Sequence, residues 1–110
     1  MSATLDALDD VFNALADPSR RDILQRLVQQ GEGTATSLAE DLPISRQAVV
    51  KHLNQLDRAR LVTGRKIGRE VRYQPHPERL TDAARRIEAI AIDWDRTLAM
   101  LKRIAEEAEG

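Results

Sequence analysis

The chain has 110 residues, of which 42% are hydrophobic and 32% charged, so its length and composition predict one soluble globular domain over residues 1–110. The lack of cysteine excludes disulfides, thiol catalysis and thiolate metal sites. The net charge is only −1, no apolar run approaches the roughly 18 residues of a membrane span, and the acidic start MSATLDALDD does not resemble a signal peptide. We therefore expect a cytoplasmic protein with no membrane contact.

The charges are unevenly distributed along the chain. Residues 44–74 carry eight basic side chains against two acidic ones, a net charge of +6, so the remainder carries −7. Such polarity indicates an anionic partner for the middle of the chain, and an accidental scatter of exposed charges is the alternative. The aromatic residues Phe12, Tyr73 and Trp94 are too few for a protein that stacks on single-stranded bases.

Two helices are predicted before residue 34. Apolar residues at three- and four-residue spacing predict a first helix over residues 4–16. They are Leu5, Leu8, Phe12 and Leu15. Asp17 is a good N-cap and Pro18 suits the first position of a second helix, which Gly31 and Gly33 end. The predicted buried stripe of this second helix is Ile23, Leu24, Leu27 and Val28.

A short third helix and an amphipathic fourth helix follow. Thr34 or Thr36 caps the third helix and Pro43 closes it, while Ser45 caps the fourth, which runs to about Arg60. One side of the fourth helix is apolar, with Val49, Leu53 and Leu56. The opposite side is polar and has no acid, with Gln47, Lys51, Asn54 and Arg58. His52 lies beside the apolar side and is predicted to be packed, not exposed for recognition.

A two-stranded hairpin with a basic tip is predicted over about residues 61–74. Val62, Val71 and Tyr73 favour strands, and Ile67 with Gly68 lies midway between them. Because a lone hairpin is marginally stable in water, we expect it to pack on the helices. Its basic residues are Arg65, Lys66, Arg69 and Arg72.

The last helix is predicted over about residues 78–108, with its start between Pro77 and Thr81. From Thr81 to Ala108 it has 28 residues and a length of about 42 Å. Its apolar residues alternate spacings of four and three, as in a coiled coil. They are Leu80, Ala84, Ile87, Ala91, Trp94, Leu98, Leu101 and Ala105. A domain this small cannot cover so long a stripe, so a second copy of the chain is the expected partner, with intramolecular packing as the alternative.

The third and fourth helices with the turn between them predict a helix-turn-helix, and the hairpin makes it a winged one. An α-helix fits the major groove of B-DNA, where base edges are read by side chains that donate and accept hydrogen bonds. Gln47, Lys51 and Asn54 are of this kind. Ser45 suits phosphates, although capping is its first role, and Arg46 suits either bases or phosphates. The plain alternative is that Lys51 is a solvated charge on an exposed face.

Three stretches resemble a known family: ADPSRRDILQRL, SLAEDLPISRQAVVKHLNQLDRARLV and GREVRYQ. In order and spacing they resemble the ArsR/SmtB family of winged-helix transcriptional repressors, over roughly residues 8–104. The resemblance implies a homodimer joined by the first and last helices, which binds an imperfect inverted-repeat operator. It places four residues nearest the DNA: Ser45, Arg46, Gln47 and Lys51.

The chain departs from that family at two places. Many members sense metal through a cysteine pair in the third helix, and others through Asp and His in the last helix. Here cysteine is absent, and Asp93 and Asp95 have no histidine after His76 beside them, so we expect no metal site and no cofactor. Members commonly carry Gly at the position of Arg60, where it forms a left-handed helix end; Arg60 is expected to adopt that strained conformation or to end the helix differently.

These observations predict a mainly α fold, a winged helix-turn-helix with a two-stranded β wing and long terminal helices that form a homodimer. The predicted function is that of a dimeric double-stranded DNA-binding repressor of the non-metal-sensing type, whose effector the residues do not identify. The predicted DNA-binding residues are Ser45, Arg46, Gln47, Lys51, Asn54, Arg65, Lys66, Arg69 and Arg72, and the predicted dimer interface is Leu5, Leu8, Phe12, Ile87, Ala91, Trp94, Leu98 and Leu101.

The alternative function is a dimeric module that binds an acidic protein through its winged helix. An enzyme is not expected, because no nucleophile with an adjacent base and no phosphate-binding glycine loop is present.

Overall fold

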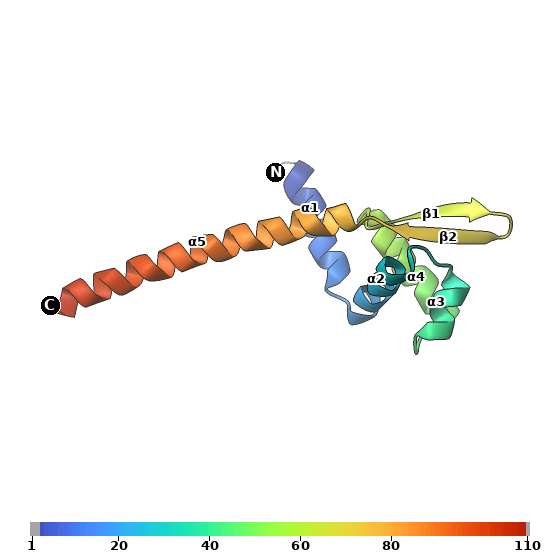
Figure 1. Ribbon diagram of the computed structural model, residues 1–110, viewed down its shortest axis with the longest axis horizontal. Coiled ribbons are helices and arrows are strands. Elements are labelled where there is room, and N and C mark those ends of the chain that lie inside the picture. Colours follow the sequence, from blue (N-terminus) through green and yellow to red (C-terminus); the bar gives the residue numbers. More distant parts are fainter. Residues whose placement is uncertain (1–2, 110) are drawn as a thin grey trace. The chain divides into compact units, whose positions relative to one another are not determined.

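The computed structural model describes the backbone of residues 3–109 and the side chains of residues 9–107. Within these residues, five helices and one hairpin follow each other along the chain (Figure 1). They are α1 (Ala3–Leu15), α2 (Pro18–Gln30), α3 (Ala35–Asp41), α4 (Arg46–Arg58), β1 (Val62–Ile67), β2 (Glu70–Pro75) and α5 (Pro77–Glu109). Contacts within the chain divide it into two units, 1–80 and 81–110, and each is described by itself.

The predicted N-caps of α2 and α4 are confirmed. Asp17 Oδ1 accepts hydrogen bonds from the backbone N–H groups of Ser19 (2.8 Å) and Arg20 (3.2 Å), and Pro18 occupies the first turn. Ser45 Oγ accepts from the N–H of Ala48 at 3.1 Å. Each side chain thus satisfies N–H groups that have no partner within the helix.

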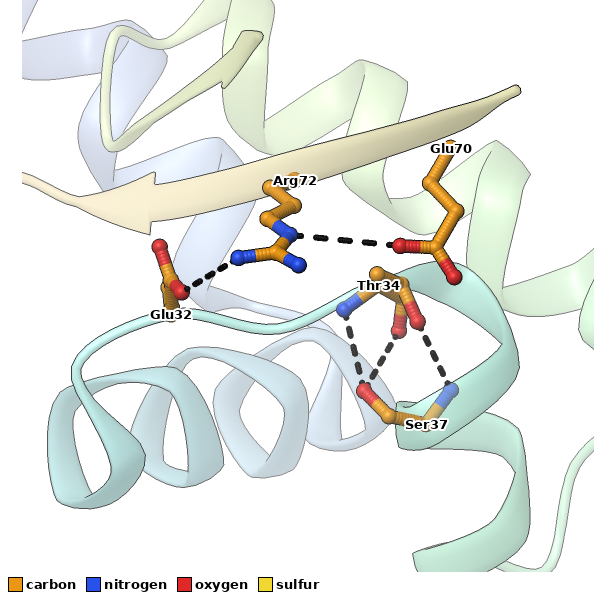
Figure 2. A network of polar contacts seen from close by, with 5 residues as sticks. All are labelled: Glu32, Thr34, Ser37, Glu70 and Arg72. Carbon is orange, nitrogen blue, oxygen red and sulfur yellow. Dashed lines mark hydrogen bonds and ion pairs between the residues drawn. The ribbon is translucent and has the colours of Figure 1, made fainter. Parts of the chain in front are cut away.

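The start of α3 decides between the two threonines that the sequence offered. Thr34 is the N-cap: its Oγ1 accepts from the Ser37 N–H (3.0 Å), and Ser37 Oγ accepts from the Thr34 N–H (2.9 Å), as Figure 2 shows. This reciprocal pair is a capping box in which serine takes the position usually held by glutamate or glutamine. Thr36 is left on the outer surface of the helix.

Helix α4 ends at Arg58, two residues before the predicted end. Arg60 has a φ of +60°, the left-handed conformation in which glycine is favoured. The N–H of Arg60 donates to Asp57 O at 2.9 Å, and the N–H of Leu61 donates to Leu56 O at 2.9 Å. This is a Schellman ending, and Leu56 and Leu61, both fully buried, supply the apolar contact that accompanies it.

The hairpin pairs β1 with β2 in antiparallel register, from Val62 opposite Pro75 to Ile67 opposite Glu70. Gly68 and Arg69 form the turn, and Gly68 has a φ of +64°, as expected of a type II′ turn. The hairpin is also tied to the helical part through Gly33 and Tyr73, each of which donates its N–H to the carbonyl of the other at 3.1 and 2.8 Å. The expectation that the wing packs on the helices is therefore confirmed.

The core of residues 1–80 lies where α2, α3 and α4 meet the base of the wing. Its fully buried large side chains are Val11, Ile23, Leu27, Leu38, Val49, Leu53, Leu56, Leu61 and Val62. Val28, which the sequence placed in the buried stripe of α2, is 45% exposed, so that prediction was wrong. At about 100° per residue, Val28 lies close to Leu24 but well away from the direction in which Ile23, Leu24 and Leu27 point together.

Helix α5 is 33 residues long, so it extends for about 50 Å. Within residues 81–107 its large apolar side chains are all exposed. Among the residues that the structure describes, no helix combines the length and the apolar character that crossing a membrane requires.

Candidate nucleic-acid interface

Helix α4 has two sharply different faces. Val49, Leu53 and Leu56 have no exposed surface. Opposite them, the predicted reading residues and the cation at the end of the helix are exposed: Gln47, Lys51, Asn54 and Arg58. We call these four residues the polar face of α4. Because the apolar face is held in the core, the polar face can point only outward, with no acidic side chain among its members.

Arg46 connects the two helices of the helix-turn-helix. Its Nε donates a hydrogen bond to Thr36 Oγ1 at 3.2 Å, from the first turn of α4 to the first turn of α3. Both side chains are exposed, so the guanidinium keeps its remaining N–H groups for an outside acceptor. Sequence reasoning considered Thr36 only as a cap. Its contact with Arg46 spans ten residues and has no signal in local spacing.

The wing presents its charges on both faces. Alternate side chains of a strand point to opposite faces, so Val62, Gly64 and Lys66 share one face and Thr63, Arg65 and Ile67 share the other. Gly64 faces Tyr73, and a Cβ at Gly64 would lie 2.9 Å from the Tyr73 ring, so only glycine lets the ring lie across the strand. Lys66 therefore lies on the same face of the wing as Val62, which packs into the core at the base of the wing, and Arg65 lies on the opposite face.

Arg72 lies directly opposite Arg65 and is engaged within the chain. Its NH1 group donates to Glu32 Oε1 at 3.2 Å, and its Nε lies 3.9 Å from Glu70 Oε2 (Figure 2). Glu70, the acidic residue of the wing strands, therefore pairs with a neighbouring cation. Within the described residues, Arg65, Lys66 and Arg69 have no such carboxylate partner.

The other titratable groups near α4 have structural roles. The pKa of Asp17 lies below its ordinary value of 3.8, first because the Arg20 N–H bonds to the carboxylate and then because the Ser19 N–H does, with smaller contributions from the charges of His52 and Arg20. His52 is half-buried beside the apolar face, as predicted. His76 contacts Thr63 Oγ1 through Nε2 and Glu78 Oε1 through Nδ1 (3.2 Å), linking the base of the wing to the first turn of α5.

The predicted interface residues of α5 are exposed, with Trp94 at 61%. Two further exposed side chains, Ile90 and Ile104, precede Ala91 and Ala105 by one residue and widen the predicted stripe. We call these residues the apolar stripe of α5: Ile87, Ile90, Ala91, Trp94, Leu98, Leu101 and Ile104. Reading the spacing as strict alternation of four and three missed Ile90 and Ile104.

In α1, Phe12 is 36% exposed, whereas Val11 and Ala14 are buried. The side chains of Leu5 and Leu8, also predicted at the interface, lie outside those that the structure describes. Across the described residues, no three His, Asp or Glu side chains are arranged to hold a metal ion.

Comparison with known proteins supports this architecture. A helix-turn-helix domain model matches residues 15–65, which run from the end of α1 into the wing. The HTH-type transcriptional regulator Rv2034 of Mycobacterium tuberculosis is 42% identical over 88 residues, which cover 80% of this chain and 75% of the relative. The transcriptional repressor SdpR of Bacillus subtilis is 34% identical over 76 residues, covering 69% of this chain and 83% of that protein.

Solved structures agree with the sequence relatives. An ArsR-like transcriptional regulator from Rhodococcus sp. RHA1 superposes with a TM-score of 0.81 at 45% identity, covering 94% of this chain and 97% of that one. A homodimeric winged helix-turn-helix DNA-binding domain from Mycobacterium bovis, solved by NMR, has a TM-score of 0.64 at 29% identity and covers 84% and 82%. With the predicted helix order, caps and wing all present, the chain belongs to the ArsR/SmtB-type family of winged helix-turn-helix transcriptional regulators.

Proposed function

We propose that two copies of this chain bind an inverted-repeat operator in double-stranded DNA and repress transcription by blocking RNA polymerase. The observation that carries this proposal is the polar face of α4. It is an exposed helix surface of amides and cations, held outward by an apolar face that is completely buried. An α-helix of this kind fits the major groove, where every base pair presents a distinct pattern of donors and acceptors.

In this proposal the DNA-binding residues divide into two groups. Gln47, Lys51 and Asn54 read base edges, since their side chains donate or accept hydrogen bonds without a negative charge. The remaining predicted residues contact the phosphates and set the position of the protein on the duplex. They are Ser45 and Arg46 at the start of α4, and Arg65, Lys66, Arg69 and Arg72 on the wing.

The apolar stripe of α5 supports a dimer. Seven apolar side chains along one helix, most of them about half exposed, would be costly to leave in water, and the related Mycobacterium bovis domain is a homodimer. Phe12 of α1 is also available for the interface. A dimer places two copies of α4 at successive major grooves of one face of the duplex, about 34 Å apart.

Fluorescence anisotropy tests the proposal directly. Duplexes selected by the protein from a random library are titrated with the full chain at several salt concentrations. If about six of the ten cations that this assignment gives to the dimer neutralise phosphates, log K falls with log salt at a slope near −5. A library that yields no bound duplex, or binding that ignores salt, contradicts the proposal and favours the alternative of an acidic protein partner.

Lys51→Ala identifies the reading helix within the same assay. Loss of a base contact is expected to weaken binding to the selected duplex by about 1–3 kcal/mol and to relax the preference at one base position. The matched control is Lys102→Ala on α5, which removes the same charge and is expected to leave affinity nearly unchanged. Equal effects of the two variants would mean that Lys51 acts only through net charge.

A further inference from the structure

Among the cations of the wing, Arg72 is the one that contacts carboxylates within the described part of the chain. Its guanidinium contacts carboxylates on two sides, Glu32 at 3.2 Å and Glu70 at 3.9 Å. The side chains of Arg72 and Glu32 are each 43% exposed, so both remain accessible from solvent. The remaining predicted wing cations, Arg65, Lys66 and Arg69, have no carboxylate partner in the described part of the chain.

The backbone brings Glu32 and Arg72 together. Gly33 and Tyr73, their immediate neighbours, exchange both backbone hydrogen bonds. On the other side of Gly33, the capping box of α3 fixes Thr34 (Figure 2). The backbone beside Glu32 is therefore held at Gly33 by Tyr73 and at Thr34 by Ser37. Glu32 and Arg72 are 40 residues apart in sequence. The backbone pairing of Gly33 with Tyr73 brings their side chains together, so the ion pair does not depend on the chance approach of two flexible side chains.

The neighbouring charges explain why a carboxylate is useful at this place. Arg65 lies directly opposite Arg72 in the register, and like charges in that arrangement repel each other. Glu32 offsets this repulsion. Its carboxylate also offers the guanidinium the same kind of oxygen acceptor as a DNA phosphate does, because arginine binds carboxylates and phosphates with one geometry.

We propose that Glu32 occupies the phosphate-binding position of Arg72 and thereby lowers the affinity of the wing for DNA. The inference rests on the proposed function and adds a residue that sets the affinity without contacting a base. In the wild-type protein the unpaired wing cations meet the phosphate backbone, and Arg72 joins them only when DNA displaces Glu32. The relevant ligand is the backbone phosphate of double-stranded DNA.

The test measures full-length wild type and Glu32→Gln against one selected duplex across a range of salt concentrations. Glutamine keeps the size of the side chain and removes its charge. Losing one competing exposed ion pair in each protomer is expected to tighten binding about 2- to 30-fold at low salt. The slope of log K against log salt should become more negative by about 1 to 2, because each added phosphate contact contributes about 0.9.

Two further variants separate this effect from net charge. Arg72→Gln in the Glu32→Gln background is expected to abolish the gain in affinity, whereas Arg72→Gln in the wild type has a smaller effect. Glu106→Gln, which removes one exposed carboxylate from α5, is expected to change neither the affinity nor the slope by more than about twofold. Melting temperatures of all variants verify that they fold.

The outcomes distinguish this inference from the proposed function. If wild type binds the duplex and Glu32→Gln binds with the same or weaker affinity and an unchanged slope, Glu32 does not compete with phosphate and the inference is overturned. A gain that persists when Arg72 is also replaced overturns it as well. If neither wild type nor any variant binds DNA, the proposed function itself fails.

Discussion

The two parts of the chain, residues 1–80 and residues 81–107, differ in the burial of their apolar side chains. In residues 1–80 the helices and the wing bury a set of large aliphatic side chains almost completely. In residues 81–107 the side chains of the apolar stripe are exposed, several by about half or more. The first part encloses a core of its own, whereas a helix as long as α5 gains stability from an apolar face only when another surface covers it. Stability of the first part should therefore depend on single core residues, and that of the second on association.

The largest expected effect comes from a charge on the apolar stripe. Leu98→Glu would place a carboxylate from each protomer in the proposed interface, at a desolvation cost of several kcal/mol per charge. We expect the dissociation constant of the dimer to rise more than about 100-fold, measured by analytical ultracentrifugation over a concentration series. DNA affinity should fall with it.

Ala99→Glu is the matched control, since Ala99 lies one residue away, on the side of α5 turned from the stripe. It should leave the dimer intact. A Leu98→Glu protein that remains as dimeric as the wild type would show that α5 is not the interface.

A core substitution tests the first part. Leu53→Ala removes a side chain with no exposed surface from α4 and leaves a cavity beneath the polar face. The free energy of unfolding is expected to fall by about 2–5 kcal/mol, measured by urea denaturation at a fixed protein concentration. Val28→Ala, at an exposed site of α2, should cost much less. Similar losses for both variants would contradict the burial described for this core.

A substitution at Arg60 is expected to change the free energy of unfolding by less than Leu53→Ala does, and in the opposite direction. Its left-handed conformation strains an arginine but not a glycine, and the Schellman hydrogen bonds need only the backbone. Arg60→Gly is expected to raise the free energy of unfolding by about 0.5–1 kcal/mol. Arg58→Gly, at the last residue of α4, should lower it by up to about 1 kcal/mol, so the two replacements two residues apart differ in sign.

The smallest effect concerns the pH dependence of the α2 cap. Because the pKa of Asp17 is lower in the folded state than its ordinary 3.8, the unfolded chain binds more protons in this range. The carboxylate therefore contributes stability above pH 3.8 that is lost as the pH falls through the folded-state pKa. Asp17→Asn keeps a good capping group without the charge. The difference in unfolding free energy between wild type and this variant should shrink as the pH falls below 3.8, and a constant difference would show that the carboxylate charge is not the cause.

Local features of the chain were predictable where nearest neighbours decide the structure. Asp17 and Ser45 were recognised as caps because an N-cap bonds to an N–H only two or three residues away. The turn at Gly68 and the outward face of α4 followed from side-chain type and helical spacing in the same way. The roles of the predicted DNA-binding and interface residues stay predictions, which the experiments above address.

Features that depend on distant residues were not predictable. Spacing placed Val28 in the stripe of α2, but the positions of α1, α4 and the wing decided which side of α2 was covered. The choice of Thr34 over Thr36 is local but was left open by helical spacing, because it depended on Ser37, three residues after Thr34, returning the hydrogen bond. For Arg60 the sequence left two alternatives, and the burial of Leu61 beside Leu56 accompanies the left-handed ending that was found.

By itself, then, the sequence determined the order of helices and wing, the caps of α2 and α4, and the polarity of α4, since each follows from interactions within a few residues. Only the tertiary structure decided that Arg72 is shared with Glu32, because the pairing of Gly33 with Tyr73 joins segments 40 residues apart. Such long-range contacts decide which cations of the wing are available to a ligand, whereas the composition gives only the number of cations present.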